Sequence, residues 1–253
     1  MTERNRRYVK IFEELSNRAF MRDIPIFSHF LTVAEQTILW QSRSQLAVEW
    51  KLFGGTAYAE RQMVGFFPDA FSAVMDTHPF PLVYLLVSPR SPRFGEELGH
   101  RDILGACMNL GVKREMLGDI YTKGQQAVMI ADARIEDFLT RELERIKHTA
   151  VNVKRIDTFP NDFITPPQLD AVSVSSLRLD VFLAELFGLS RKIAAELVDE
   201  GRAMINSLPM YSKNYQMKAG DILSARGYGR VRFIETFGES KKGRIWIHFE
   251  RYQ

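Results

Sequence analysis

The stretch LRLDVFLAELFGLSRKIAAELVDEGRAMIN, residues 177–206, decides the fold of the C-terminal part of the chain. Apolar residues in its first half follow the i, i+3, i+4, i+7 spacing of a one-sided helix, and Gly188 suits the end of that helix. Ser190 is a residue type that caps helices, and Gly201 would end the second helix. We therefore expect two short helices followed by a strand that begins near Met204.

A turn and a basic tip follow this stretch. Ala219-Gly220-Asp221 predicts the turn, and residues 222–225 alternate as a strand does. The strand would deliver two arginines to the tip Arg226-Gly227-Tyr228-Gly229-Arg230, where glycines let the backbone approach a partner without a Cβ in the way. Ordinary solvated charge explains the basic residues of the two helices equally well, and it is the continuation into this tip that favours a binding surface.

The whole run resembles the small RNA-binding domain of ribosomal protein S-four, also called the αL motif. The sequence departs from the family pattern at Met204, where valine is usual, and at Ser207, where a small turn residue, commonly glycine, follows the asparagine. Both departures lie on the core and turn side, away from the surface that would contact RNA. The matching positions are Arg178-Leu179-Asp180, Ser190-Arg191, Gly201, Asn206, Gly220-Asp221 and the basic strand that follows.

This resemblance implies a physical mechanism of RNA binding. Basic side chains from the second helix and the following loop would straddle phosphates, while shape and 2′-hydroxyl contacts supply selectivity. Asn206 has a second interpretation, as a residue that only shapes a turn. The expected RNA contacts are Arg178, Ser190, Arg191, Lys192, Asn206, Lys213, Arg226 and Arg230.

The placement of charge agrees with this expectation. The whole chain carries 34 Lys and Arg against 31 Asp and Glu, a net charge of +3. From Arg178 onward there are 13 basic and 9 acidic residues, a surplus of +4, which leaves 21 against 22, or −1, for residues 1–177. The positive surplus therefore lies in the segment that resembles an RNA-binding domain.

Composition excludes several classes of protein. At 253 residues the chain is long enough for two or three small domains. The single cysteine, Cys107, excludes an internal disulfide and a cysteine-based metal cluster, and it suits a reducing compartment. The N-terminus has no apolar run typical of a signal peptide, and no uninterrupted run of ~18 apolar residues could span a membrane. We expect a cytoplasmic protein without membrane insertion.

The N-terminal part predicts an α+β fold. A first helix around residues 9–15 is broken at Asp23-Ile24-Pro25, and Ser28 could cap a second helix. A hairpin about Gly54-Gly55 comes next. The further expected elements are strands at 81–87, 118–121, 127–130 and 151–156, with helices from 98 to about 111 and over 133–147.

Taken together, these elements suggest one sheet covered on one face by two helices. The prolines and serines after residue 160 are typical of a linker. The predicted domains are an N-terminal helical segment at 1–44, a central α+β domain at 45–160, a linker at 161–176 and an αL domain at 177–253.

The middle of the chain carries a second resemblance. The runs LGHRDILGA at 98–106, LGVKRE at 110–115 and LGDI at 117–120 are similar to the hallmark of the YlmH family, encoded in the cell-division gene cluster of Gram-positive bacteria. The resemblance implies N-terminal helices, a central RNA-recognition-motif-like (ferredoxin-like) α+β sandwich and a C-terminal αL domain. It also implies binding to ribosomal RNA and tRNA on the large ribosomal subunit, as a monomer, in the quality control of stalled nascent chains.

The central domain departs from a true RNA-recognition motif, because no Lys/Arg-Gly-Phe-Gly-Phe run with paired aromatic residues occurs, and this argues against base stacking on its sheet. A second RNA-facing surface could still lie there. An alternative interpretation of the same residues is a set of buried hydrogen bonds that fix a helix and a tight turn. The residues in question are His100, Arg101, Lys113, Arg114 and Asp119.

Three short runs resemble catalytic motifs, but each lacks a part that the chemistry needs. His100-Arg101-Asp102 resembles a kinase catalytic loop, but Cys107 stands where that loop has asparagine. Arg178-Leu179-Asp180 resembles the pseudouridine synthase motif but opens the αL unit, and Gly227-Tyr228-Gly229 lacks the helix that a methyltransferase cofactor loop needs. We expect no catalytic residue, metal or cofactor. The alternative is a pseudouridine synthase-like or methyltransferase-like RNA-modifying enzyme that captures its substrate with the αL domain.

Overall fold

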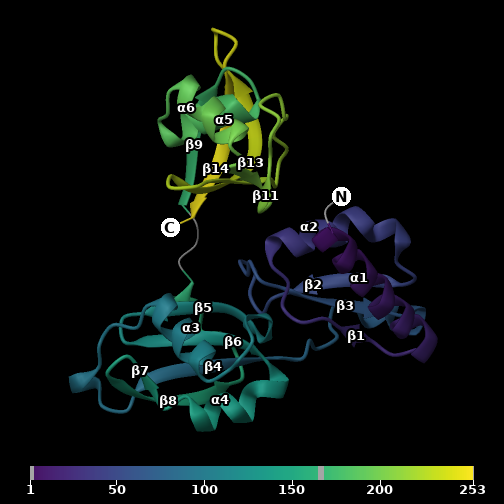
Figure 1. Ribbon diagram of the computed structural model, residues 1–253, viewed down its shortest axis with the longest axis vertical. Coiled ribbons are helices and arrows are strands. Elements are labelled where there is room, and N and C mark those ends of the chain that lie inside the picture. Colours follow the sequence, from purple (N-terminus) through teal and green to yellow (C-terminus); the bar gives the residue numbers. More distant parts are fainter. Residues whose placement is uncertain (1–2, 165–167, 253) are drawn as a thin grey trace. The chain divides into compact units, whose positions relative to one another are not determined.

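The computed structural model describes residues 3–164 and 168–252, which form two compact units of mixed α+β structure with N-terminal helices and antiparallel sheets (Figure 1). Each unit has hydrophobic clusters of its own. Among the described helices, none combines the length and the apolar character needed to cross a bilayer.

The N-terminal layer of the first unit consists of two helices and a small sheet in the order β1-β3-β2. Phe12, Leu39 and Phe66 are fully buried where the helices meet this sheet. Central strand β3 is buried along its whole length. The elements are α1 (Glu3–Arg22), β1 (Ile26–Phe27), α2 (Val33–Ser42), β2 (Glu49–Phe53) and β3 (Met63–Phe67).

The second helix begins later than the sequence predicts. Its N-cap is Thr32, whose hydroxyl accepts from the N–H of Glu35, while the Glu35 carboxylate accepts from the N–H of Thr32 at 2.8 Å. This reciprocal capping box satisfies N–H groups that the helix cannot satisfy itself. The predicted cap, Ser28, instead accepts from the N–H of Val64 at 3.0 Å and ties β1 to β3. The prediction of Ser28 as the cap is therefore wrong.

The central sheet has five antiparallel strands in the order β5-β6-β4-β8-β7. Residues Val83, Leu85 and Val87 of β4 are buried against residues of α3 and α4, which cover one face of the sheet. The elements are β4 (Leu82–Pro89), α3 (His100–Asn109), β5 (Leu117–Lys123), β6 (Gln126–Asp132), α4 (Glu136–Glu142), β7 (Arg145–Ile146) and β8 (Thr149–Ile156).

Two expectations about this unit need correction. The hairpin of β2 and β3 does not join the central sheet and instead forms a separate three-stranded sheet with β1. The helix expected over 133–147 ends at Glu142, because Leu143 leaves the helical conformation with ψ 76° and the chain enters strand β7. Lys147, with a left-handed φ of 51°, then lies in the tight turn between β7 and β8. Periodicity alone did not reveal these strand pairings.

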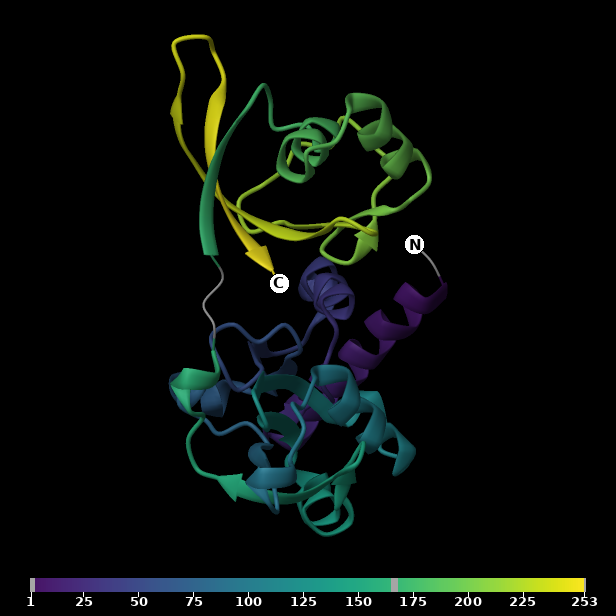
Figure 2. The same cartoon turned by 90° about the vertical axis from the view of Figure 1, so that its left-hand side faces the viewer.

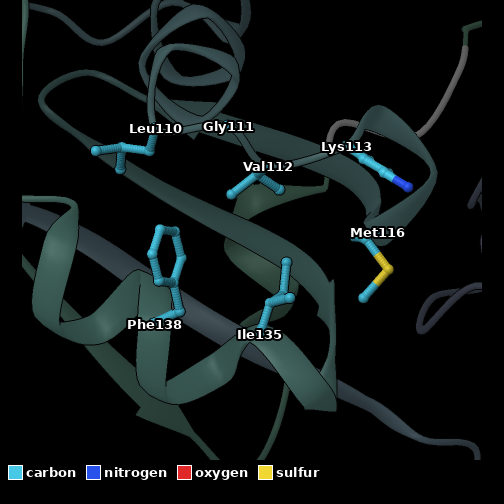
Figure 3. A pocket seen from close by; sticks show the side chains of 7 residues that line it. All are labelled: Leu110, Gly111, Val112, Lys113, Met116, Ile135 and Phe138. Atoms are coloured by element: carbon cyan, nitrogen blue, oxygen red, sulfur yellow. The ribbon is translucent and has the colours of Figure 1, made fainter.

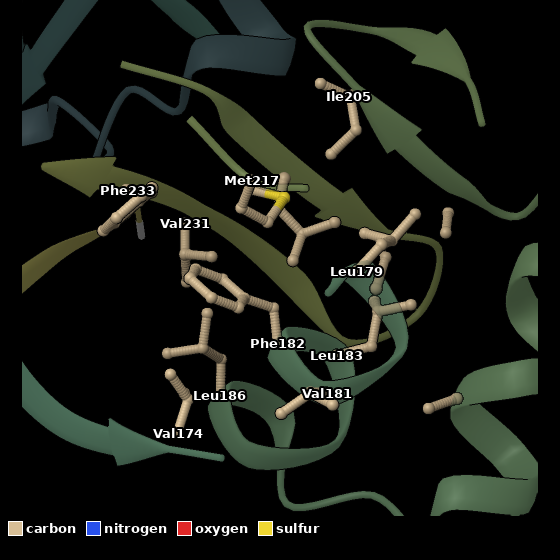
Figure 4. Packing of buried hydrophobic residues seen from close by; sticks show 14 of the residues in the cluster. Val174, Leu179, Val181, Phe182, Leu183, Leu186, Ile205, Met217, Val231 and Phe233 are labelled. Atoms are coloured by element: carbon tan, nitrogen blue, oxygen red, sulfur yellow. The ribbon is translucent and has the colours of Figure 1, made fainter. Parts of the chain in front are cut away.

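The second unit is a six-stranded sheet in the order β11-β10-β12-β13-β14-β9, with its core between the sheet and two helices (Figure 4). Strand β9 lies within the range predicted as a linker and pairs with β14 from Gln168↔Arg251 to Val174↔Ile245. The elements are β9 (Gln168–Val174), α5 (Leu179–Phe187), α6 (Arg191–Asp199), β10 (Ala203–Ile205), β11 (Leu208–Pro209), β12 (Ile222–Ala225), β13 (Gly229–Glu239) and β14 (Ile245–Tyr252).

Local signals in this unit are confirmed. Gly188 ends α5 in the left-handed conformation with φ 64°, and Ser190 is the N-cap of α6. Phe182 of α5 packs edge-on against Phe233 of β13, with ring centroids 5.2 Å apart. The core therefore fixes the two helices on one face of the sheet.

Candidate functional site

The first turn of α6 presents two cations from a fixed backbone. The Ser190 hydroxyl accepts from the N–H of Ile193 at 3.3 Å, and buried Ala194 holds the helix on the core. Arg191 and Lys192 are both exposed, and among the described residues neither forms an ion pair. The N–H groups and dipole at a helix N-terminus favour an anion, so the two side chains add charge where phosphate is already favoured.

The basic tip between β12 and β13 contacts residues that flank α6 in the sequence. Phe187, which precedes α6, has its Cε1 atom 3.8 Å from the position that a Cβ of Gly229 would take. On the other flank, the N–H of Arg226 donates to the carbonyl of Arg202, just after α6, at 3.1 Å. The guanidinium of Arg230 lies 5.9 Å from the centre of the Tyr252 ring. The tip therefore lies against the end of α5 and the residues that follow α6, and none of these contacts involves the first turn of α6.

Arg178 and Lys213 belong to a different group, at the start of α5. Arg178 donates to both carboxylate oxygens of Asp180 at 2.9 Å, and the Lys213 ammonium lies 2.7 Å from Asp199. Burial alone would raise the pKa of Asp180, but the hydrogen bonds and charge of Arg178 outweigh it and hold that pKa below its ordinary value. Both cations are already neutralised, so an RNA phosphate would have to share them with a carboxylate.

Asn206 shapes a turn. Its backbone has φ 51°, its side-chain oxygen accepts from the N–H of Ile222 at 2.9 Å, and its amide donates to Asp221 at 3.1 Å. Asp221 also accepts from the hydroxyl of Tyr215 at 2.9 Å. Burial, and then the bond to Asp221, raise the pKa of Tyr215 to about 12. Both functional groups of the Asn206 side chain are therefore occupied, and the geometry fits the turn interpretation.

The second predicted surface, in the central sheet, separates into buried and exposed members. Arg114 donates to the carbonyls of Leu117 at 2.6 Å and Gly118 at 3.1 Å. Asp119 accepts from the N–H of Glu60 at 2.6 Å and, more weakly, from that of Arg61 at 3.3 Å. Arg114 and Asp119 therefore hold the chain together in the way that the alternative interpretation predicts.

Partial burial shifts the pKa values of Arg114 and Asp119. It lowers the pKa of Arg114 to about 10, with the charge of Arg61 acting in the same direction. It raises the pKa of Asp119 to about 6. Arg61, which sequence reasoning missed, completes the joint by donating to the carbonyls of Leu117 and Phe30, each at 3.0 Å. No local sequence signal marks Arg61, because its partners come from other elements.

The remaining members of that surface, His100, Arg101 and Lys113, are exposed. Partial burial lowers the pKa of His100, and the charges of Arg114 and Arg101 lower it further. Lys113 also borders a shallow hollow of about 270 Å³ (Figure 3). The hollow is lined by Leu110, Gly111, Val112, Lys113, Met116, Ile135 and Phe138, whose side chains are apolar except for the lysine.

The other face of the central sheet is covered in part by the N-terminal layer. Tyr84 of β4 donates to the carbonyl of Gly55 at 2.7 Å, and the hydroxyl of Tyr121 in β5 lies 2.8 Å from that of Thr56. Ile130 of β6 is fully buried beside them. These aromatic rings are therefore engaged in packing and cannot serve as an open platform for bases.

The described part of the chain offers little for catalysis. No group of three or more His, Cys, Asp or Glu stands together there as a metal site would need. Cys107 is buried, and burial raises the pKa of its thiol to about 11, which disfavours the reactive thiolate.

The chain is a mixed α+β protein with exposed cations at a capped helix, features that RNA-binding proteins use to hold phosphate, and known RNA-binding and ribosome-associated proteins are similar to it. A family model described as "Putative RNA-binding domain in YlmH" matches residues 86–159. "Ribosome-associated protein quality control protein P2" of Bacillus subtilis (strain 168) is 31% identical over 228 residues, which cover 88% of this chain and 85% of that protein. The chain belongs to the YlmH family.

A solved structure is also similar. It is "Cell division protein ylmH from Streptococcus pneumoniae", with 17% sequence identity and a TM-score of 0.49, and the match covers 64% of this chain and 94% of that one.

Proposed function

We propose that this chain is a non-enzymatic RNA-binding protein that binds ribosomal RNA and tRNA on the large ribosomal subunit. It acts there, as a cytoplasmic monomer, in the quality control of stalled nascent chains. The observation that carries the proposal is the first turn of α6, where a capped helix N-terminus and the exposed Arg191 and Lys192 point to phosphate. The name of the B. subtilis relative supports the ribosomal setting.

We further propose the domain types. The order β4-α3-β5-β6-α4-β8, with sheet order β5-β6-β4-β8, is that of a ferredoxin-like domain of the RNA-recognition-motif type, which we assign to residues 82–156 within the predicted range 45–160. The helices within residues 1–44 would form an N-terminal layer together with β2 and β3. Two short helices followed by a strand, and the basic tip after β12, support an αL domain of the S-four type at 177–253. The linker would lie within 161–176, before β9 begins.

The contacts follow from the chemistry of the side chains involved. The guanidinium of Arg191 can hold two phosphate oxygens at once, while Lys192 acts as a point charge beside it. Arg226 and Arg230 on the basic tip would reach a second part of the backbone, so that the RNA is straddled. Arg178 and Lys213 would contribute less, since each already has a carboxylate partner.

A binding experiment on purified large ribosomal subunits tests the proposal. Reversing the charges with Arg191→Glu and Lys192→Glu in the full chain should weaken cosedimentation at least about tenfold, as loss of two phosphate contacts implies. The matched control is Arg6→Glu with Arg7→Glu, an adjacent pair of exposed cations in α1, outside both proposed RNA surfaces. Equal losses from both pairs would mean that bulk charge, and not the α6 geometry, drives binding.

The enzyme alternative gains no support from the described residues. Both carboxylate oxygens of Asp180, the aspartate of the motif shared with pseudouridine synthases, accept from Arg178. The tip Gly227-Tyr228-Gly229 leads into strand β13 and not into a helix. A pseudouridine synthase or methyltransferase assay with ribosomal RNA as substrate should therefore give no turnover.

A further inference from the structure

The outer face of the β13–β14 hairpin carries an exposed aromatic cluster. Side chains of a strand alternate between faces, and in β14 Ile247 and Phe249 point into the core below α5 and α6. Trp246 and His248 therefore lie on the opposite face. Both views of the chain show that this hairpin extends beyond the rest of its unit (Figures 1 and 2).

A bulge brings a third ring to the same face. Pairing runs Phe233↔Phe249 and then Glu235↔His248, so β13 has one extra residue at this point. Phe233 points into the core, and the extra residue reverses the alternation. A second register shift, between Thr236 and Gly238, falls at Phe237, which points outward. Phe237 stacks on His248 with ring centroids 3.9 Å apart and an angle of 11° between the rings. The strand is thus shaped to place this ring on the surface.

The cluster is held in place before any partner arrives. The Nδ1 atom of His248 lies 3.1 Å from the Glu235 carboxylate, which orients the imidazole under Phe237. Trp246 extends the surface, with its ring centre 6.1 Å from that of Phe237. Rings fixed in this way lose little freedom on binding, which favours recognition of another flat ring.

The rings remain accessible although they are large and apolar. Phe237 is 47% exposed and Trp246 is 39% exposed, in a unit that buries Phe182, Phe233 and Phe249 almost completely. Their exposure is therefore a local feature of this hairpin, and the unit's core does not need them.

Charge indicates which partner fits. Residues 229–252, from β13 through β14, hold six Lys and Arg against three Asp and Glu, a surplus of +3. Lys241 and Lys242 are exposed in the turn that joins the strands. Aromatic rings combined with scattered cations are typical of surfaces that bind unpaired nucleotides, because every base has a face that can stack and every nucleotide carries a phosphate.

We propose that Phe237 and Trp246 form a stacking platform for unpaired RNA nucleotides. The platform would be a second RNA site, separate from the phosphate-binding surface of α6, and it rests on the proposed function only in taking RNA as the ligand. His248 is a positioning residue that supports the Phe237 ring. An RNA with a helical part and adjoining unpaired nucleotides would use both sites.

The test uses the full chain and two probes, an RNA hairpin with a blunt end and the same hairpin with a short oligoadenylate overhang that contains 2-aminopurine. Stacking on a protein ring should quench 2-aminopurine, and the overhang should tighten binding about tenfold, within the range for one stacked base. Phe237→Ala and Phe237→Leu should both abolish this gain and the quenching. Phe237→Trp should retain them.

Matched variants separate the possible outcomes. Phe20→Ala removes a ring that is 61% exposed in α1 and should leave the overhang effect unchanged. If Phe237→Leu keeps the full gain, the patch recognises apolar surface, as a protein partner would supply, and the stacking proposal is overturned. Absence of quenching in the wild-type complex overturns it too. Binding of the blunt hairpin that Arg191→Ala leaves unchanged would instead contradict the α6 surface.

Discussion

The start of α6 and the α3–β5 segment both combine arginine with an apolar core, yet they use it in opposite ways. At α6 the guanidinium of Arg191 is exposed beside a capped helix N-terminus. Just before strand β5 of the central sheet, the guanidinium of Arg114 donates hydrogen bonds to the carbonyls of Leu117 and Gly118. An arginine is available to RNA only where the protein's own backbone does not occupy it. Arg114 lies within residues 86–159, the range that matches the family model of an RNA-binding domain.

The two main sheets also differ in whether their aromatic rings are covered or exposed. The central sheet covers the rings of Tyr84 and Tyr121 with the N-terminal layer, and burial raises the pKa of Tyr121 to about 12. The C-terminal sheet leaves Phe237 and Trp246 on an outer face. If the central domain binds RNA, its exposed members Arg101 and Lys113 must do so without help from these tyrosines.

The largest expected effect is on the stability of the first unit. Replacing Arg114 by alanine removes the charged donor of the Gly118 carbonyl and one of the two charged donors of the Leu117 carbonyl, and it should lower the free energy of unfolding by about 3 kcal/mol. Lys113→Ala, at the exposed neighbouring position, should change it by less than about 0.5 kcal/mol. Urea unfolding of both variants measures the difference, and similar losses would show that Arg114 is no more structural than its neighbour.

Asp119 should make stability depend on pH in an unusual direction. Its pKa is raised from 3.8 to about 6 by burial, so the folded state holds its proton more tightly than the unfolded state. The stabilisation from this proton is fully present below pH 3.8 and is lost as the pH rises to about 6. The loss is on the order of 2 to 3 kcal/mol, since one pKa unit corresponds to about 1.4 kcal/mol.

The check on Asp119 is a comparison with Asp119→Asn, which cannot titrate. Across the same pH range the wild type should lose stability relative to this variant. Other acidic groups contribute equally to both proteins and cancel in the difference. Parallel stability curves for the two proteins would mean that Asp119 titrates normally and that its contacts to the N–H groups of residues 60 and 61 dominate over burial.

RNA binding should depend more on Arg191 than on the hairpin lysines. Arg191→Ala should weaken binding of a blunt helical RNA by about 1 to 3 kcal/mol, the range for hydrogen bonds to charged groups, with the fold intact. Lys241→Ala with Lys242→Ala should cost less, because those side chains lie in a turn and must give up more freedom. Titrations at one salt concentration compare them, and a larger loss for the lysine pair would favour simple charge density.

The salt dependence of RNA affinity gives a second test of the phosphate contact by Arg191. Each phosphate contact releases counterions, so the slope of log affinity against log salt should become shallower by roughly 0.7 to 0.9 for each contact removed. Arg191→Ala should therefore change the slope, whereas Arg114→Ala should leave it as in the wild type. An unchanged slope for Arg191→Ala would place the guanidinium away from phosphate.

The smallest effect should come from the cap itself. Ser190→Ala removes the acceptor for the N–H of Ile193 and should destabilise the second unit by about 1 kcal/mol. Ser190→Asp keeps an acceptor and adds a negative charge that suits the helix dipole, so it should retain stability while repelling phosphate. Loss of RNA affinity in Ser190→Asp without loss of stability would separate the two roles of this position.

The sequence by itself determined the local elements of the second unit. The spacing of apolar residues, Gly188 and Ser190 set the ends of α5 and α6, because helix periodicity and capping depend on neighbours only a few residues away. The glycines around the tip at 226–230 act through the same local chemistry. The exposed cations at 191 and 192 could therefore be named before any contact was known.

Only the tertiary structure decided which strands share a sheet and which polar groups are free to bind. The joint between Thr56 and Tyr121 links positions 65 residues apart, and the orientation of Phe237 depends on a bulge fixed by β14. Partners on other elements also determine the roles of Ser28, strand β9 and Arg61. Burial and hydrogen bonding are properties of the folded neighbourhood, so a local pattern can suggest an arginine but cannot say what occupies it.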